Sequence, residues 1–143
     1  MGNSERLIRG KPVVAGKATG EALVSAEPLS FWGGYDAATG EIIDRRHPLS
    51  GAVAAGKVLV IPFTRGSSTT TAVLLESVKA GTAPAGIITA RTDTFLSLAS
   101  IVADEMYAKP IPIVAVKRED FERFETGQVI KIHPDGRVIV ETQ

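Results

Sequence analysis

The chain has no cysteine among its 143 residues. Without thiols it cannot form disulfides, use a cysteine nucleophile or hold a metal through thiolates. The irons of an iron–sulfur cluster are held mainly by cysteine thiolates, so any cluster would have to be bound by another chain. The lack of cysteine is also compatible with a reducing compartment.

An excess of either charge is missing as well. The 16 basic and 16 acidic residues cancel, giving a formal net charge of zero. Proteins that bind nucleic acid need basic residues to displace the counterions of the phosphates, so we expect no nucleic-acid partner. A small chain without net charge lacks the repulsion that keeps proteins dispersed, which favours a protein partner.

Long hydrophobic runs are absent too. No segment approaches the roughly 20 apolar residues that cross a membrane, and the start MGNSERLIRG has no apolar signal core. We therefore expect a cytoplasmic protein without membrane contact. Aromatic residues make up only 6% of the sequence, but 44% is apolar, which is enough for a core. The length is typical of one domain, and we expect residues 1–143 to form one.

The middle of the chain alternates between apolar runs and helical patterns. Nearly continuous apolar runs are typical of parallel strands buried on both faces, and they occur at residues 57–61, 86–89 and 111–116. Helices are predicted over residues 70–80 and 94–106. We expect the second helix to bury Phe95, Leu98, Ala99 and Val102, which lie at i, i+3, i+4 and i+7. This order predicts a parallel α/β unit with right-handed crossovers.

Both ends of the chain are rich in glycine and strand formers. Extended segments are predicted at 7–8, 12–15 and 20–25, and a hairpin at 128–133 and 137–141 turns on Pro134-Asp135-Gly136. A short helix is expected over 120–124, and a short strand over 41–44 within the irregular stretch from 26 to about 56. The prediction is an α/β fold with β/β/α layers, in which the parallel unit packs against a small β-barrel or second sheet.

The segment from Ile61 to Thr71 follows the first buried strand. Gly66 permits a sharp turn there, and hydroxyl residues then open a helix. Ligands of open α/β sheets bind outside the carboxyl ends of the strands. A helix N-terminus offers unpaired N–H groups and the positive end of a dipole, and Arg65 adds a positive charge. The segment therefore suits a carboxylate or a phosphate.

Two familiar motifs can be excluded for this segment. It lacks the glycine spacing and the lysine of a P-loop, and it lacks the first glycine of a GxSxG nucleophile elbow. A purely structural interpretation remains equally open at this point, in which Ser67 or Ser68 only caps the helix.

Several motifs in order carry a resemblance that covers residues 10 to 116. They are Ser-Phe-Trp-Gly-Gly at 30–34, Thr-Gly-Glu-Ile-Ile-Asp at 39–44, His-Pro-Leu-Ser-Gly at 47–51, Gly-Lys-Val-Leu-Val at 56–60 and Arg-Gly-Ser-Ser at 65–68. The sequence resembles the swivel domain, or small subunit, of aconitase X. The resemblance implies a swivelling β/β/α domain that is inactive without a large catalytic subunit.

The resemblance also implies a reaction, in which a hydro-lyase (dehydratase) removes water from a small hydroxy acid. Ser67 matches the serine that the family's small subunit supplies as an alkoxide base, which takes the proton next to the substrate carboxylate. The large subunit is expected to hold an iron–sulfur cluster or iron, and this chain is expected to bind no metal or cofactor. Arg65, the helix N–H groups and exclusion of water would favour the ionised serine.

Other residues are assigned by their place in these motifs, except Arg91, which follows the second buried strand at the carboxyl end of the sheet and could bind a carboxylate. Expected substrate contacts are Ser30, Gly33, Gly34, Arg65, Gly66, Ser68 and Arg91, and expected contacts with the large subunit are Phe31, Trp32 and His47. Three of these assignments have a simpler alternative. The aromatic residues of the first motif could pack in the core, His47 could have a structural role, and Arg91 could lie in a solvated loop.

Two substrates follow from the resemblance. Bacterial-type members convert cis-3-hydroxy-L-proline to Δ1-pyrroline-2-carboxylate, and archaeal-type small subunits serve mevalonate 5-phosphate dehydratase. Archaeal-type sequences more often continue as Gly-Ser-Thr-Val-Gly after the strand, so Gly-Ser-Ser-Thr-Thr at 66–70 favours hydroxyproline. A different hydroxy acid remains open. The alternative of another class is a swivelling interaction or carrier domain without a catalytic serine.

Overall fold

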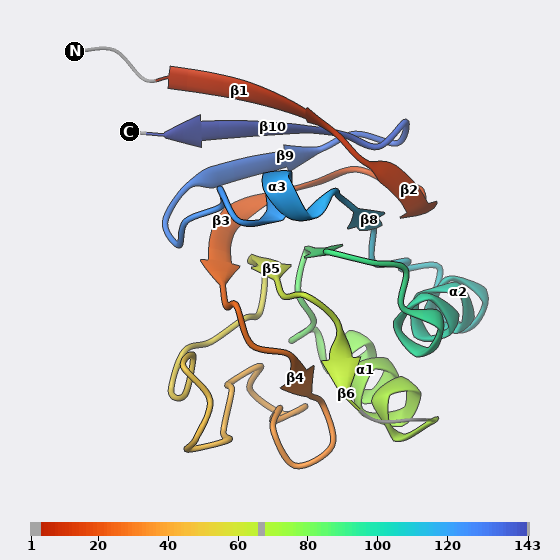
Figure 1. Cartoon of the computed structure of the whole chain (residues 1–143). Helices are drawn as coiled ribbons and strands as arrows, with labels where there is room; N and C mark the ends of the chain where they lie inside the picture. The colour runs from red at the N-terminus through yellow and green to blue at the C-terminus, as the bar shows by residue number, and fades with distance from the viewer. Residues whose placement is uncertain (1–3, 66–67, 143) are drawn as a thin grey trace.

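The structure, a computed structural model, describes residues 4–65 and 68–142 and is dominated by one strongly curved sheet (Figure 1). The sheet has eight strands in the order β1-β10-β9-β3-β5-β7-β8-β2. Their bounds are β1 Ser4–Arg9, β2 Lys11–Val14, β3 Ala18–Val24, β5 Val58–Val60, β7 Gly86–Thr89, β8 Ile113–Ala115, β9 Val129–Ile132 and β10 Arg137–Thr142.

The two edge strands of this sheet are consecutive in sequence. Only Gly10 separates β1 from β2, so one crossing segment nearly closes the sheet into a barrel. The Gly10 N–H donates to the carbonyl of Gly136 at 3.0 Å, and a Cβ at Gly10 would collide with the Val114 side chain. The bare backbone therefore allows this closure, and the predicted barrel-like half is confirmed.

The parallel half is also confirmed. β3, β5, β7 and β8 pair in parallel, and helices α1 (Ser68–Ala80) and α2 (Thr94–Tyr107) form the crossovers from β5 to β7 and from β7 to β8. The short helix α3 (Arg118–Phe121) follows β8. Figure 1 shows α1 and α2 side by side, away from the antiparallel strands β1, β10 and β9.

The central strands send alternate side chains into two cores. One core lies with the helices and includes Leu59, Ile61, Ile87, Ile113, Leu74 and Leu96. The other lies inside the barrel and includes Val58, Val60, Ile88, Val114, Ile130 and Val138. Burial on both faces explains why the sequences of β5 and β7 show no polar alternation.

The predicted inward face of α2 was only partly right, because Ala99 is buried but Phe95 and Leu98 are not. The buried residues are Leu96, Ala99, Ser100 and Ala103, whereas Phe95 and Leu98 are 41% and 47% exposed. Ser100 tolerates burial because its hydroxyl donates to the Ile111 carbonyl at 2.6 Å and accepts from the Ile111 N–H at 2.7 Å. α2 is apolar around most of its circumference, so hydrophobic period alone could not identify its inner face.

The stretch from residue 26 to 56 contains a strand that the sequence did not predict. β4 (Leu29–Ser30) pairs in parallel with β6 (Thr64–Arg65) in a separate two-stranded sheet. The expected strand over 41–44 is reduced to isolated bridges, Tyr35 with Ile42 and Glu41 with Val53. No helix within the described residues is long and apolar enough to cross a membrane.

Candidate functional site

The small β4–β6 sheet brings two predicted segments together. Leu29 pairs with Thr64 and Ser30 pairs with Arg65, so the turn over residues 30–34 begins beside the segment that leads into α1. Gly66 and Ser67 lie outside the described residues, and Ser68 is described only as the first residue of α1. The predicted roles of these three residues therefore stay predictions.

The turn over residues 30–34 is held by its own backbone. The Ser30 hydroxyl donates to the Trp32 carbonyl at 3.0 Å, and Gly33 has a φ of +77°. At Gly34 a Cβ would collide with the Ser30 carbonyl oxygen. The glycines thus fold a tight turn at the end of β4. Substrate contacts by Ser30, Gly33 and Gly34 stay predictions.

The two aromatic residues of this turn have opposite environments. Phe31 is fully buried, with its ring centroid 4.9 Å from that of Tyr35. In this chain the Phe31 side chain packs inside its own core, and its expected contact with another subunit stays a prediction. Trp32 is 67% exposed. It lines an open groove of about 560 Å³ whose other wall includes Ala72, Val73 and Glu76 of α1.

Tyr35 fixes the floor beneath this groove. Its hydroxyl donates to the Thr82 carbonyl at 2.8 Å, which joins the long loop to the end of α1. Burial raises the pKa of the Tyr35 hydroxyl, because an ionised phenolate would be poorly solvated there.

Asp93 is a site residue that the sequence did not single out. Its Oδ2 accepts from the Thr64 N–H at 2.7 Å and from the Thr64 hydroxyl at 2.5 Å. Its Oδ1 accepts from the Leu96 N–H at 3.1 Å, which caps α2. The carboxylate therefore ties β6 to the start of α2. The available signal was an aspartate directly before a helix, which marks an N-cap but does not reveal the partner Thr64.

Arg91 lies at the end of β7, as expected, and stacks on Phe63. Its guanidinium carbon is 3.8 Å from the Phe63 ring centroid, a cation–π contact that orients the side chain. Both residues line a second pocket of about 370 Å³, which also includes Pro62, Ala90 and Phe121. This pocket lies at the carboxyl ends of β5 and β7, where α/β sheets bind ligands.

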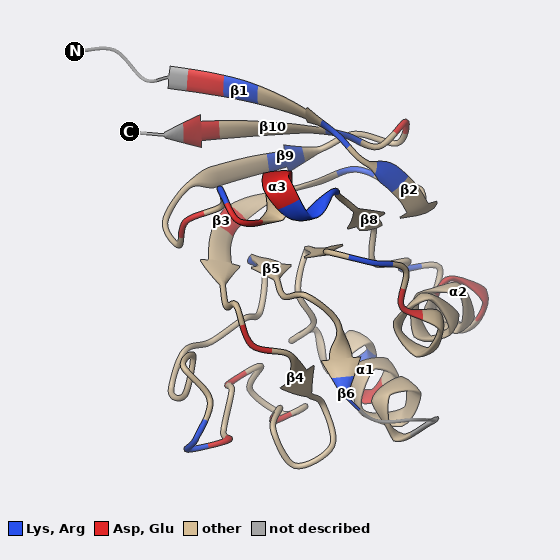
Figure 2. Ribbon diagram, viewed as in Figure 1, with Lys and Arg blue, Asp and Glu red and all other residues tan. Residues whose placement is uncertain are grey.

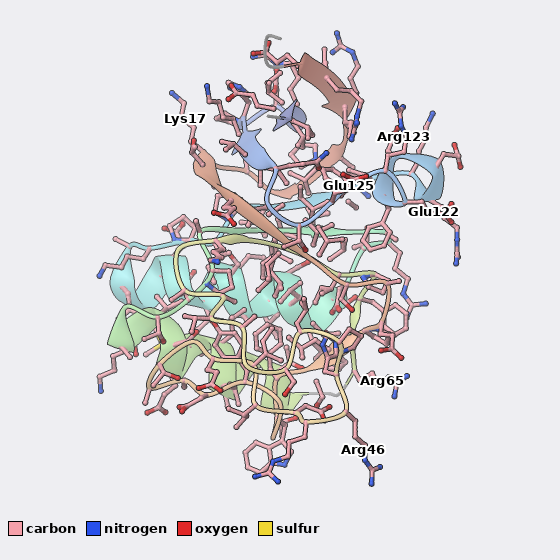
Figure 3. The ribbon with its side chains drawn as sticks, turned by 90° about the vertical axis from the view of Figure 1, so that its left-hand side faces the viewer. Lys17, Arg46, Arg65, Glu122, Arg123 and Glu125 are labelled. Carbon is pink, nitrogen blue, oxygen red and sulfur yellow. The ribbon has the colours of Figure 1, made fainter. Side chains whose placement is uncertain are left out.

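Positive charge at this end of the molecule is not neutralised locally. Among residues 4–65 and 68–142, neither Arg65 nor Arg91 forms an ion pair with a carboxylate. Arg65 is exposed, and Figure 3 shows Arg65 and Arg46 at the same edge, both pointing away from the body of the molecule. An unpaired guanidinium group can bind an anionic ligand through several N–H groups.

His47 is largely buried within its own loop. It is 8% exposed, and its Nδ1 accepts from the Leu49 N–H at 3.1 Å. The Asp44 carboxylate accepts from the Arg46 N–H at 3.0 Å. Both side chains shape their own loop, and the expected interface role of His47 stays a prediction.

The part of the chain that the structure describes does not fit an iron site. It contains no group of three or more His, Cys, Asp or Glu side chains that could hold a metal ion, and the sequence has no cysteine. We derive no step of the chemistry through a metal in this chain.

Comparison with known proteins identifies the family. A family model described as the aconitase X swivel domain matches residues 7–141. The chain belongs to the aconitase X swivel family. The resemblance predicted from the five motifs is thereby confirmed, and with it the fold. The crystal structure of Thermococcus kodakaraensis aconitase X (holo-form) superposes with a TM-score of 0.84 and 34% identity, over 94% of this chain and 98% of that chain.

Named relatives of this swivel domain are dehydratases of two kinds. A cis-3-hydroxy-L-proline dehydratase of Pseudomonas aeruginosa is 45% identical over 83% of the chain. A phosphomevalonate dehydratase small subunit of Methanopyrus kandleri is 39% identical over 93% of the chain and 96% of that subunit. The chain spans about a fifth of the length of the two cis-3-hydroxy-L-proline dehydratases, 20% and 21%.

Proposed function

We propose that this swivel domain is the small subunit of an aconitase X-type hydro-lyase and acts only together with a large subunit. The observation that carries the proposal is the pairing of Ser30 with Arg65. It sets the turn over residues 30–34 beside the segment that opens α1, at the carboxyl end of the parallel sheet. The dehydratase names of the relatives support the reaction class.

In this proposal Ser67 supplies the base. Its alkoxide takes the proton from the carbon next to the substrate carboxylate, and the hydroxyl on the neighbouring carbon departs, takes up a proton and is released as water, giving a C=C double bond. For cis-3-hydroxy-L-proline this first product is an enamine, which tautomerises to the C=N bond of Δ1-pyrroline-2-carboxylate. A serine serves as a base only when its anion is favoured. Arg65, two residues before it, and the N-terminus of α1 provide positive potential nearby.

The remaining residues would bind and orient the substrate. Arg65 and Arg91 are the cations available for its carboxylate, and Arg91 is already oriented by Phe63. The backbone of Ser30, Gly33 and Gly34, together with Gly66 and Ser68, would surround the acid. Trp32, with its exposed ring, would contact the large subunit, as exposed aromatics at interfaces often do. Iron or an iron–sulfur cluster would belong to that subunit.

The favoured substrate is cis-3-hydroxy-L-proline, converted to Δ1-pyrroline-2-carboxylate. The Ser-Thr-Thr continuation after Gly66-Ser67 and the 45% identity to the Pseudomonas aeruginosa dehydratase support it. Mevalonate 5-phosphate is the second candidate, supported by the relatives that match over nearly their full length, such as the Methanopyrus kandleri subunit. Both substrates present a carboxylate to the same arginines.

The test is to purify the chain with the large aconitase X-type subunit of the same organism and assay both substrates. Wild type should dehydrate one of them, and Ser67→Ala should lower kcat by about 10²–10⁴-fold, the usual contribution of a base. Thr69→Ala is the matched control, because Thr69 lies in the same first turn of α1 and has no role in the proposal; loss of a helix cap alone costs about 1 kcal/mol of stability. Turnover of neither substrate by the wild-type complex would favour a non-catalytic interaction or carrier domain.

A further inference from the structure

The outer face of α2 is apolar and uncovered. Phe95, Leu98 and Ile101, here termed the α2 outer face, lie at i, i+3 and i+6 and are 41%, 47% and 51% exposed. The sequence contains no charged residue between Thr94 and Ala103, and Figure 2 shows charge on α2 only toward its end. A helix that faces water normally carries polar residues on that side. Contiguous exposed apolar side chains therefore mark an interaction surface.

This face begins at the candidate site. Phe95 lies in the first turn of α2, and its carbonyl accepts from the Thr71 hydroxyl at 3.4 Å in the first turn of α1. The segment carrying the proposed base leads directly into that turn of α1. Asp93, two residues before Phe95, holds Thr64. The α2 outer face thus extends from the edge of the site along the outside of the molecule, where Figure 1 shows α2.

We propose that the α2 outer face is a docking surface for the large subunit. This inference rests on the proposed function, because that site is completed only when a second chain reaches the start of α1. A chain that covers the start of α1 would contact Trp32 and the groove between Trp32 and α1 on one side. On the other side it would contact Phe95 and then Leu98 of α2. The large subunit would therefore straddle the start of α1.

Two observations favour this occupant over a second copy of the chain. In the Pseudomonas aeruginosa relative the matching region is 20% of one polypeptide, so this domain is joined there to a much longer chain. A second copy would also bring no group of metal ligands, since the described residues contain none.

The test measures affinity for the large subunit. Calorimetric titration of the purified large subunit with the Leu98→Lys/Ile101→Lys double variant should show a Kd raised at least about ten-fold, because a buried charge is costly at the centre of an apolar contact. Leu7→Lys is the matched control, with the same substitution at 48% exposure on β1, and its Kd should match wild type. At saturating small subunit, the double variant should reach the wild-type kcat.

Three outcomes distinguish the possibilities. An unchanged Kd for the double variant, with its fold verified by circular dichroism, overturns this inference. Loss of self-association in sedimentation experiments, with affinity for the large subunit unchanged, assigns the face to a second copy and also overturns it. If wild type itself neither binds the large subunit nor supports turnover, the proposed function fails instead.

Discussion

The Asp93 carboxylate accepts hydrogen bonds from both donors of Thr64, the backbone N–H at 2.7 Å and the hydroxyl at 2.5 Å. The two residues are 29 positions apart, and the bond fixes β6 against the start of α2. A third donor, the Leu96 N–H, reaches the other carboxylate oxygen at 3.1 Å. Three donors converge on one carboxylate that is only 9% exposed. The segment that leads to Arg65 and Ser67 is therefore held by β4 on one side and Asp93 on the other.

Replacing Asp93 with asparagine should disrupt these three hydrogen bonds, although the two side chains have nearly the same size and shape. An amide offers one acceptor oxygen and one NH₂ group, so either Thr64 or Leu96 would face a donor. We expect a loss of about 1–3 kcal/mol in the free energy of unfolding, measured by urea denaturation, together with a lower kcat in the complex. Asp44→Asn is the control, because the Asp44 carboxylate accepts from the Arg46 N–H within its own loop. Equal effects of the two substitutions would contradict a special role for Asp93.

Gly34→Ala should be more damaging than Gly33→Ala. At Gly34 the added methyl group meets the Ser30 carbonyl oxygen, whereas nothing lies within 4 Å of a Cβ at Gly33. The φ of +77° at Gly33 makes alanine there cost about 1–2 kcal/mol. Gly34→Ala should exceed that cost and also lower turnover, because Ser30 pairs with Arg65. Thermal unfolding and steady-state assays check this order, and a reversed order would contradict the described turn.

Arg91→Lys should weaken substrate binding without unfolding the chain. Lysine keeps the charge but loses the planar group that stacks on Phe63 and can bind a carboxylate through two nitrogens. We expect KM to rise by about ten-fold, equivalent to one lost charge-assisted hydrogen bond of about 1.4 kcal/mol. Steady-state kinetics of the complex measure it. An unchanged KM for both Arg91→Lys and Arg91→Met would leave Arg91 as a solvated loop residue.

Stability should fall at high pH through Tyr35. Burial raises the pKa of its hydroxyl in the folded state, whereas an unfolded tyrosine titrates near pH 10. The contribution of the neutral phenol is therefore complete below about pH 10 and is lost as the pH rises from there toward the folded pKa. Urea titrations between pH 8 and 11 should show this decline in wild type. The decline should be smaller in Tyr35→Phe, which also loses the bond to Thr82 at every pH. Parallel curves for the two proteins would contradict this assignment.

Much of the fold could be predicted because its strands are buried on both faces. The runs at 57–61 and 86–89 correspond to β5 and β7, and both helices were expected within two residues of their observed starts. The inner face of α2 was predicted correctly only at Ala99, because apolar residues surround most of the helix. The start of α2 is tied to β6 by the bonds between Asp93 and Thr64, which are contacts between specific atoms and leave no periodic pattern.

The site could be predicted only in part, because the contacts that assemble it leave no pattern in the sequence. The motifs at 30–34 and 65–68 were found separately, but their contact depends on a ladder of two residue pairs that leaves no periodic signal. Phe31 and Trp32 are neighbours of similar chemistry, and the backbone direction after Ser30 alone decides that the first is buried and the second exposed. The role of Asp93 was not predicted, because hydrogen bonds between residues far apart in the chain do not follow from composition or spacing.

The account depends most on Ser67. The direct measurement is single-turnover dehydration by the reconstituted complex, comparing wild type with Ser67→Ala at matched stability and saturating large subunit. We predict that the variant binds the large subunit and the substrate normally but forms product about 10²–10⁴-fold more slowly. Product formation at a near-wild-type rate by Ser67→Ala would contradict the proposal that this chain supplies the base.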